Sequence, residues 1–404
     1  MTKLDDQIAQ DRKALEHHSP GDTGQAIALY NLAHSLYDKF VEKDNIAHLE
    51  EAIVLHQSVL NLRPPGHSDR SDSLHDLALC FSRRYDKQGT IAYLEQAITL
   101  GRAALELSPA GHSGRANTLY NLADCLRKRF LKLEVNGDLD EAFSLHQSVL
   151  DLRPAGHPNR SDSLHSLAVC FCHRYDKQGT TADLEQAITL GRAALALRSP
   201  GHSGRANTLY NLADDLRKMF LKLGANGDLD EAISLHRSAL DLRPAGHPDR
   251  LASLNWLEDC LTSRFEKLET VTDLDELISL RRAILDLYPQ GHGDHVESID
   301  KLLLLVRKRV QGHHMGAVLD ECISLGSSAL ASGEAGNPAR ATYLDDLVTD
   351  LHSRFRKSDV QEAHPDHADS LHKLLIHVND HFDDGDVAPV VDAIVVIARA
   401  ALKL

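Results

Sequence analysis

A cluster of histidines and aspartates near the C-terminus has residue types and a spacing that could bind a metal ion. His377 and His381 are four residues apart, which places them on one face of a helix, and Asp384 follows within reach. Two imidazoles and a carboxylate suit a divalent ion. The acidic run at 383–386 could instead hold magnesium and, through it, a diphosphate. The chain carries 25 histidines, so such clusters arise easily, and neither pattern completes a known motif.

A Gly-His pair recurs every 45 residues, and such a regular series of histidines suggests a row of metal ligands. Equivalent positions on neighbouring helix pairs lie about 8–10 Å apart, whereas two imidazoles on one ion need nitrogens about 2 Å from the metal. The repeated histidine therefore cannot chelate across units. We expect it to cap the carbonyls of the preceding helix or to fix the turn that follows. The pairs end in His67, His112, His157, His202, His247 and His292.

The six cysteines follow the repeat and are too widely spread for a disulfide framework. Four of them lie three residues after a repeated Leu, at a small packing position where a free Cys behaves as a compact hydrophobe: Cys80, Cys125, Cys170 and Cys260. Cys172 breaks this pattern, but C-x-C spacing alone is weak evidence for a metal. No histidine or acid is expected beside a cysteine in a nucleophile-like arrangement.

Motifs that would require a cofactor are missing from the sequence. It contains no Walker loop, dinucleotide fingerprint, nucleophile elbow or HExxH pattern. No cofactor is therefore expected, unless the cluster at 377–386 binds a divalent metal.

A polar face recurs along the first helix of alternate units. It combines Asn, Tyr and basic side chains, spaced as one side of a helix. A side-chain amide both donates to and accepts from a peptide backbone, and Tyr adds contact area at low entropic cost. The face is a candidate peptide-binding surface; the alternative is that its asparagines bridge neighbouring helices. Its residues are Asn31, Asn117, Tyr120, Asn121, Arg127, Asn207, Tyr210, Asn211 and Arg217.

These residues must be positioned by a helical repeat. A glycine recurs at 21, 66, 111, 156, 201, 246, 291 and 336. Residues 66–155 and 156–245 are near copies, so the duplicated block is a pair of units, in which odd and even units present different faces to each other. Copying a pair preserves every interface between neighbours.

Each unit contains two amphipathic helical patterns, illustrated by 115–130 and 138–152. In the second, we expect Asp138 to be the N-cap, with Glu141 completing a capping box. Leu152 belongs to its predicted buried stripe, and the Pro and Gly that follow end the helix. The same start signal recurs at Asp228 and Asp273.

The small and apolar positions of the unit resemble the tetratricopeptide repeat (TPR). The match rests on Leu122, Ala123, Ala142, Val149 and Pro154, and again on Leu212, Ala213, Ala232, Ala239 and Pro244. The unit length and the Tyr-Asn-Leu-Ala sequence are similar to kinesin light chain repeats and to fungal TPR arrays. The typical TPR unit is shorter and has a large aromatic early in its first helix, which this chain lacks. The resemblance implies an all-α superhelix whose first helices line a concave, peptide-binding groove.

The repeat divides the chain into a regular and an irregular part. Residues 1–335 are predicted to form the regular solenoid, which starts with a lone second helix at 2–18 and continues in the units that begin at 21, 66, 111, 156, 201, 246 and 291. Residues 336–404 are predicted to contain degenerate repeats and a capping helix at 387–404. Because that helix is apolar on most sides, we expect one of three roles: it folds over the open end of the solenoid, mediates self-association, or once packed on a downstream domain that has been lost.

The composition excludes two classes of partner. The formal net charge is −15, and an acidic surface repels phosphate backbones and anionic lipids, so neither nucleic acid nor membrane is expected. Met1 leads directly into a charged helical segment, and no apolar stretch is long and uncharged enough to span a bilayer. A cytoplasmic protein is therefore expected.

These patterns favour a protein–protein interaction scaffold over an enzyme. The expected partner is a peptide or helix held in the concave groove. Two alternatives stay open. One is an enzyme that uses the solenoid as a small-molecule pocket, with a divalent metal near 377–386. The other is a sensor segment of a larger fungal-type signalling protein.

Overall fold

The computed structural model describes residues 3–312, apart from residues 20, 22, 136, 289–291 and 293, together with Leu325. In this part of the chain the regular elements are fourteen α-helices, and no strand occurs. The predicted all-α solenoid is thereby confirmed. The predicted metal ligands His377, His381 and Asp384 lie outside the described residues, as does the segment 336–404.

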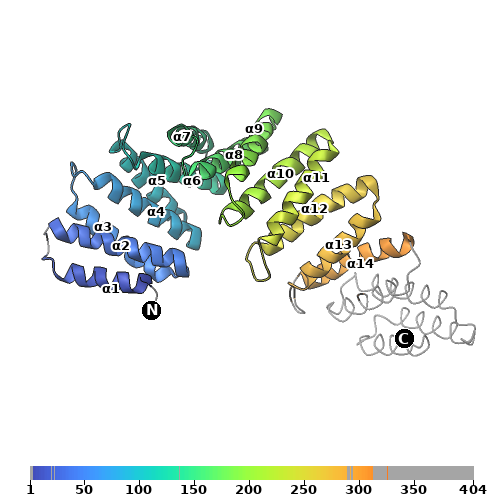
Figure 1. Cartoon of the computed structure of the whole chain (residues 1–404), viewed down its shortest axis with the longest axis horizontal. Helices are drawn as coiled ribbons and strands as arrows, with labels where there is room; N and C mark the ends of the chain where they lie inside the picture. Colours follow the sequence, from blue (N-terminus) through green and yellow to red (C-terminus); the bar gives the residue numbers. More distant parts are fainter. Residues whose placement is uncertain are drawn as a thin grey trace, which may run out of the picture. The chain divides into compact units, whose positions relative to one another are not determined.

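The chain divides into two compact units, Met1–Met219 and Phe220–Leu404. Helix α10 (Arg205–Leu223) contains the boundary and lies mostly in unit 1 (Figure 1). The other helices of unit 1 are α1 (Lys3–Glu16), α2 (Thr23–Lys43), α3 (Ile46–Leu62), α4 (Arg70–Gln88), α5 (Ile91–Glu106), α6 (Arg115–Leu133), α7 (Asp138–Leu152), α8 (Arg160–Gln178) and α9 (Thr181–Leu197).

Unit 2 continues the same alternation of helices. It contains α11 (Asn226–Asp241), α12 (Arg250–Leu268), α13 (Val271–Leu285) and α14 (His295–Gly312). Consecutive helices pack against each other, and buried apolar side chains such as Leu274 and Leu302 join α13 to α14. Among the described helices of both units, none combines the length and apolar character that a membrane span requires.

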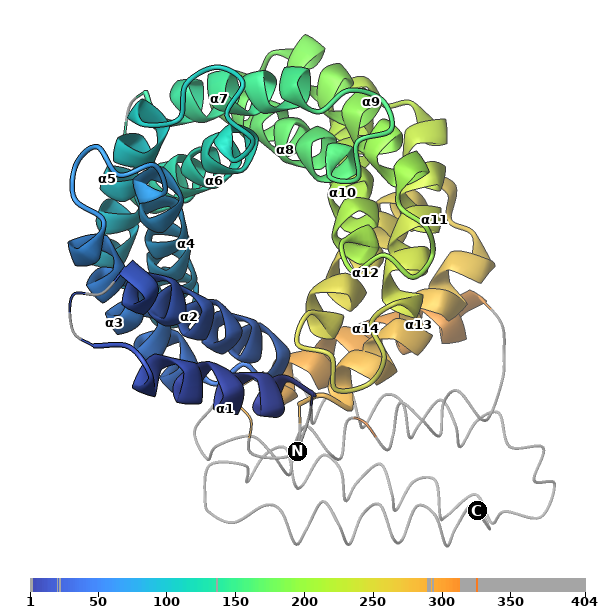
Figure 2. The ribbon, with the colours of Figure 1, turned by 60° about the vertical axis from the view of Figure 1, so that its left-hand side comes forward.

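Two kinds of helix alternate along unit 1. We call α2, α4, α6, α8 and α10 the A helices, and α1, α3, α5, α7 and α9 the B helices. Each of α2, α4, α6 and α8 packs most extensively on the B helix that follows it, while α4 also contacts α6 and α6 contacts α8. Figure 2 shows α4, α6 and α8 along the inner side of unit 1 and α3, α5, α7 and α9 outside them. We call the surface of the A helices of unit 1 the inner face.

The apolar stripes of both helices form the core, with one departure from the prediction. Leu122 and Leu126 of α6 and Val149 of α7 are at most 2% exposed. Leu152 was predicted to be buried but is 46% exposed, because α7 ends at this residue. The same helix buries His146 instead, whose side chain is 0% exposed.

The prediction of Asp138 as an N-cap is wrong. The N-cap of α7 is Gly137, and Asp138 is the first helical residue. Its carboxylate accepts two hydrogen bonds of 2.7 Å from Nε and Nη2 of Arg129 on α6. The carboxylate therefore ties the B helix to the preceding A helix instead of capping its own backbone.

The other two predicted N-caps are also displaced into the first helical turn. The N-cap of α13 is Thr270, and Asp273 accepts hydrogen bonds of 3.1 and 2.6 Å from Arg264 of α12. The N-cap of α11 is Ala225, three residues before Asp228. Arg174 and Asp183 repeat the ion pair between α8 and α9 at 2.5 Å.

The Gly-His pair fixes the turn from a B helix to the next A helix. Gly156 has a φ of 88°, in the left-handed region that glycine adopts without steric cost. Nδ1 of His157 accepts a hydrogen bond from the backbone N–H of Asn159 at 3.1 Å. The same bond, of 3.0–3.2 Å, forms at His67, His112, His202, His247 and His292. The repeated histidine thus has the local role that the sequence predicts.

Two arginines complete the hydrogen bonds of this turn. Arg160 donates to the backbone carbonyls of Leu150 and Arg153, at 3.4 and 2.5 Å, which satisfies oxygens at the end of α7. The side chain of Arg153 turns inward, where it is 3% exposed and donates to Ser163 of α8 at 3.0 Å. The B-helix carbonyls are therefore capped by arginine, and histidine secures the loop.

Candidate functional site

The structure places the predicted peptide-binding residues on the A helices, with different degrees of exposure. The exposed residues are Asn31, Asn117 and Asn207. The half-buried residues are Tyr120, Asn121, Arg127, Tyr210, Asn211 and Arg217. The contacts of the α6 residues show what holds these side chains in place.

Tyr120 joins three helices. Ser166 of α8 donates a hydrogen bond to its hydroxyl at 3.0 Å. Its ring meets that of His146 on α7 edge to face, with centroids 5.4 Å apart, and the guanidinium of Arg153 lies 5.3 Å from its centroid. Burial raises the pKa of the Tyr120 hydroxyl. Tyr120 therefore stabilises the packing of neighbouring repeats.

The asparagines of α6 also contact neighbouring elements. Oδ1 of Asn117 accepts a hydrogen bond from Nη2 of Arg153 at 2.7 Å. Nδ2 of Asn121 lies 3.5 Å from Nε2 of His75 on α4. These two asparagines therefore bridge to neighbouring elements, which is the alternative role that the sequence predicts. An amide offers two N–H groups and an acceptor oxygen, so a single contact leaves other groups of the same amide able to bond to a ligand on the inner face.

The basic side chains of α6 are held by carboxylates. Arg127 pairs with Asp124 at 2.6 Å, and Lys128 lies 2.9 Å from Asp124 and 2.7 Å from Asp86 of α4. Burial alone would raise the pKa of Asp124, but the charges of Arg127 and Lys128 outweigh it and hold that pKa well below its usual range. On α10, Arg217 pairs in the same way with Asp214 at 3.1 Å.

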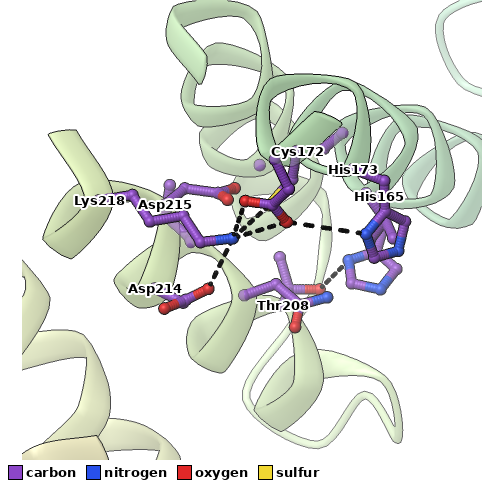
Figure 3. A pocket seen from close by; sticks show the side chains of 13 residues that line it. His165, Cys172, His173, Thr208, Asp214, Asp215 and Lys218 are labelled. Carbon is purple, nitrogen blue, oxygen red and sulfur yellow. Dashed lines mark hydrogen bonds and ion pairs between the residues drawn. The ribbon is translucent and has the colours of Figure 1, made fainter. Parts of the chain in front are cut away.

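A pocket of about 120 Å³ lies between α8 and α10, entirely within unit 1. We call it the α8–α10 pocket (Figure 3). Gly191 of α9 and the side chain of Leu212 form part of its wall. Its polar side chains come from α8, with His165, Cys172, His173 and Asp176, and from α10, with Thr208, Asn211, Asp214, Asp215 and Lys218.

The ammonium group of Lys218 lies among the polar groups of this pocket (Figure 3). Its Nζ is 3.1 Å from Sγ of Cys172, 2.8 Å from Asp176 and 3.3 Å from Asp214. Burial lowers the pKa of Lys218, but Cys172 and the two carboxylates outweigh this and raise it. The pocket therefore holds a cation at a point of concentrated negative charge.

Asp215 is the most buried acid of the pocket, at 3% exposure. Burial raises its pKa to about 7. Burial and the nearby Asp215 raise the pKa of the Cys172 thiol as well. An acid therefore lies beside Cys172, but a thiol whose pKa is raised is not activated as a nucleophile. Two helices bring these residues together from positions 43 apart, which local sequence does not reveal.

The first copy of the duplicated block forms a counterpart between α4 and α6. Six polar positions are identical in the two copies: His75, Asp86, Thr118, Asn121, Asp124 and Lys128 correspond to His165, Asp176, Thr208, Asn211, Asp214 and Lys218. Three polar positions differ, because Ser82, Arg83 and Cys125 stand where the second copy has Cys172, His173 and Asp215. Divergence at these positions is the sequence signal that could have located the pocket.

A second cavity, of about 340 Å³, adjoins the α8–α10 pocket, and His173 and Asp176 line both. Its apolar wall is formed by Phe130 and Leu131 at the end of α6. Leu131 is 51% exposed, and Nζ of Lys177 lies 5.4 Å from the centroid of the Phe130 ring. Unit 1 thus offers an apolar and a polar hollow side by side.

No protein-family model and no curated protein matches this sequence. Solved structures similar to it include TPR-like repeats of a kinesin light chain from Podosopora anserina, 23% identical over 54% of this chain and 97% of that chain, with a TM-score of 0.38. BtubC (BKLC) from P. vanneervenii is 21% identical over 60% and 92%, with a TM-score of 0.39. The apo form of the quorum sensor NprR from B. thuringiensis is 16% identical over 92% and 91%, with a TM-score of 0.48. The fold assignment therefore depends on the chain's own consecutive helix pairs, which form an all-α solenoid in the described residues.

Proposed function

We propose that the chain is a protein-interaction scaffold rather than an enzyme, and that the inner face of unit 1 binds an extended peptide of a partner protein. The observation that carries the proposal is the row of polar side chains on the A helices that hydrogen bonds and ion pairs within the chain already hold in place. Tyr120, Asn121 and Arg127 each have a partner. Side chains that are ordered before binding lose little entropy when a ligand arrives, which favours recognition.

The two hollows beside each other suggest the chemistry of the peptide. The cavity at Phe130 and Leu131 suits an apolar side chain. Glu134 and Asp176, both exposed, line the same cavity together with one lysine, Lys177, so that carboxylates outnumber the cation and favour a neighbouring basic side chain. The net charge of −15 acts in the same direction over a longer range. The proposed ligand is therefore a peptide in which an apolar residue is flanked by lysine or arginine.

Replacing Asn121 and Asn211 together by alanine should weaken peptide binding about tenfold. Each substitution removes amide groups that can bond to a peptide backbone, and each such bond contributes about 0.5–1.5 kcal/mol. The ligand would be selected from a random peptide display library on the full wild-type chain. Its affinity for both proteins would then be measured by fluorescence anisotropy.

Asn61 provides the matched control. It is an exposed asparagine near the end of α3, a B helix, so Asn61→Ala should leave the affinity unchanged. Far-ultraviolet circular dichroism would show that the double variant keeps its helices. A selected peptide that binds the double variant and the wild type equally well would refute the assignment of the inner face.

A cytoplasmic location is part of this proposal. Among the described residues, five cysteines form no disulfide: Cys80, Cys125, Cys170, Cys172 and Cys260. Cysteines in the thiol form are typical of a reducing compartment. The metal site near 377–386 and self-association through 387–404 concern residues outside the described part, and they stay predictions.

A further inference from the structure

We propose that the α8–α10 pocket binds a divalent transition-metal ion of the zinc class, with Cys172, Asp214 and Asp215 as its protein ligands. This site is separate from the predicted cluster at 377–386. It also does not depend on peptide binding by the inner face.

The positions of the three ligand atoms carry the first part of the argument. Sγ of Cys172 and one carboxylate oxygen each of Asp214 and Asp215 lie within 4.8 Å of one another. Around one zinc ion, with bonds of about 2.0–2.3 Å, ligand atoms lie about 3–4 Å apart. Small side-chain rotations therefore close the site. The pocket itself, of about 120 Å³, has room for a water molecule as fourth ligand, since one water needs about 10–15 Å³ of such space.

Lys218 marks the place where a cation is stabilised. Its ammonium group lies 3.1 Å from the Cys172 sulfur and 3.3 Å from Asp214, two of the three ligands. It also pairs with Asp176 at 2.8 Å, which is not a ligand. When the metal ion binds, Lys218 can give up the first two contacts and keep Asp176. The ion thus takes over two contacts of the ammonium group, which stays beside it on Asp176.

Metal binding changes the form of the sulfur ligand. The ion binds the thiolate, so the Cys172 proton leaves to solvent while the sulfur donates a lone pair to the metal. The carboxylates donate theirs without further change once ionised. No electron transfer takes place, and affinity should rise with pH because protons are released.

The duplicated block supplies an independent observation. Two of the three ligands, Cys172 and Asp215, are replaced in the counterpart by Ser82 and Cys125, whereas the lysine and the other acid are the same. The counterpart shows that this position packs without a carboxylate, because the buried residue there is Cys125. Burying one at Asp215 costs desolvation energy, and a bound ion would offset that cost. Both Cys172 and Asp215 are present only in the second copy, as expected if the metal site arose in that copy.

Cobalt titration of the full chain tests the proposal. Co²⁺ bound to a thiolate gives a charge-transfer absorption band in the near ultraviolet, which histidine and carboxylate ligands do not give. We expect this band to saturate near one ion per chain. Cys172→Ser should abolish it and weaken binding more than about a hundredfold, since even outer-shell partners of a metal site contribute about 10–100-fold. Cys125→Ser, at the counterpart of Asp215, should leave the band unchanged.

Two further variants separate a metal site from a merely structural cysteine. Lys218→Met removes a positive charge next to the ion and should raise the Co²⁺ affinity about tenfold or more. Ser82→Cys with Cys125→Asp should transplant the ligands into the counterpart and raise the stoichiometry from one ion to two. Absence of the band from the wild type, its survival in Cys172→Ser, or weaker binding by Lys218→Met would each overturn the proposal. If Cys172→Ser loses helicity, the variant Ser82→Cys with Cys125→Asp provides the test instead.

Discussion

Asp138→Ala should lower the free energy of unfolding by about 3 kcal/mol, because it leaves a buried guanidinium without its main partner. The Arg129 side chain is 14% exposed and donates to both oxygens of Asp138 at 2.7 Å. After the substitution its remaining partner is Glu95 of α5 at 2.8 Å, a carboxylate that is 46% exposed. Urea denaturation followed by circular dichroism would measure the loss.

Asp140→Ala is the matched control for this prediction. Asp140 lies in the same first turn of α7 but is exposed, so its removal should cost less than about 0.5 kcal/mol. Asp138→Asn keeps the shape of the side chain and should fall between the two. Equal effects of Asp138→Ala and Asp140→Ala would mean that the aspartate acts on the helix terminus, as the sequence pattern predicts, and not through Arg129.

Acidification from about pH 7 to about pH 5 should destabilise unit 1 by several kcal/mol. Four histidines have pKa values lowered to about 4, chiefly by burial: His56, His146, His165 and His173. In the unfolded chain a histidine titrates near 6.5. Between these values the unfolded state binds more protons, so stability is complete above pH 6.5 and is lost as the pH falls toward 4.

The size of the effect follows from the same shifts. Each histidine contributes roughly 2 kcal/mol over this interval. Asp215 acts in the opposite direction, because its pKa is raised to about 7, so its protonation stabilises the folded state as the pH falls. One group of that sign offsets about one of the four histidines, and the net change remains destabilising.

His146 is the site at which the acid effect can be removed. Neither of its ring nitrogens has a hydrogen-bond partner in the described part of the chain, and Asp124, Arg127 and Arg153 are the charged groups that influence its pKa after burial itself. His146→Phe should therefore flatten the pH dependence by roughly 2 kcal/mol. His17→Phe, at an exposed position after α1, should leave the dependence as in the wild type. A urea midpoint that stays constant from about pH 7 to about pH 5 would contradict the burial of neutral histidines.

Much of the fold is readable from periodicity because neighbouring units repeat the same interfaces. The spacing of Leu119, Leu122 and Leu126 predicts the buried side of α6, and the Gly-His pair predicts a local turn. The predicted N-cap role of Asp138 is wrong, because an aspartate at the start of a helix suits both an N-cap and an interhelical ion pair. Only the position of Arg129 on the neighbouring helix distinguishes the two.

The candidate site was predicted less completely, for a related reason. The periodicity places Asn121 and Tyr120 on the correct helix face, but their bonds to His75 and Ser166 join residues 46 positions apart. The pairing of Cys172 with Asp215 likewise depends on how α8 and α10 lie against each other. A single helix pattern contains no information on such contacts, whereas comparison of the two near copies points to the positions that differ.

Binding of a partner peptide to the inner face of unit 1 is the central claim, and amide hydrogen exchange tests it most directly. A peptide selected on the full chain would be added at saturation, and exchange would be compared with that of the free protein. We expect slower exchange in α6, α8 and the part of α10 up to Met219, with α5, α7 and α9 unchanged. Protection confined to those B helices, or to α11–α14, would contradict the claim.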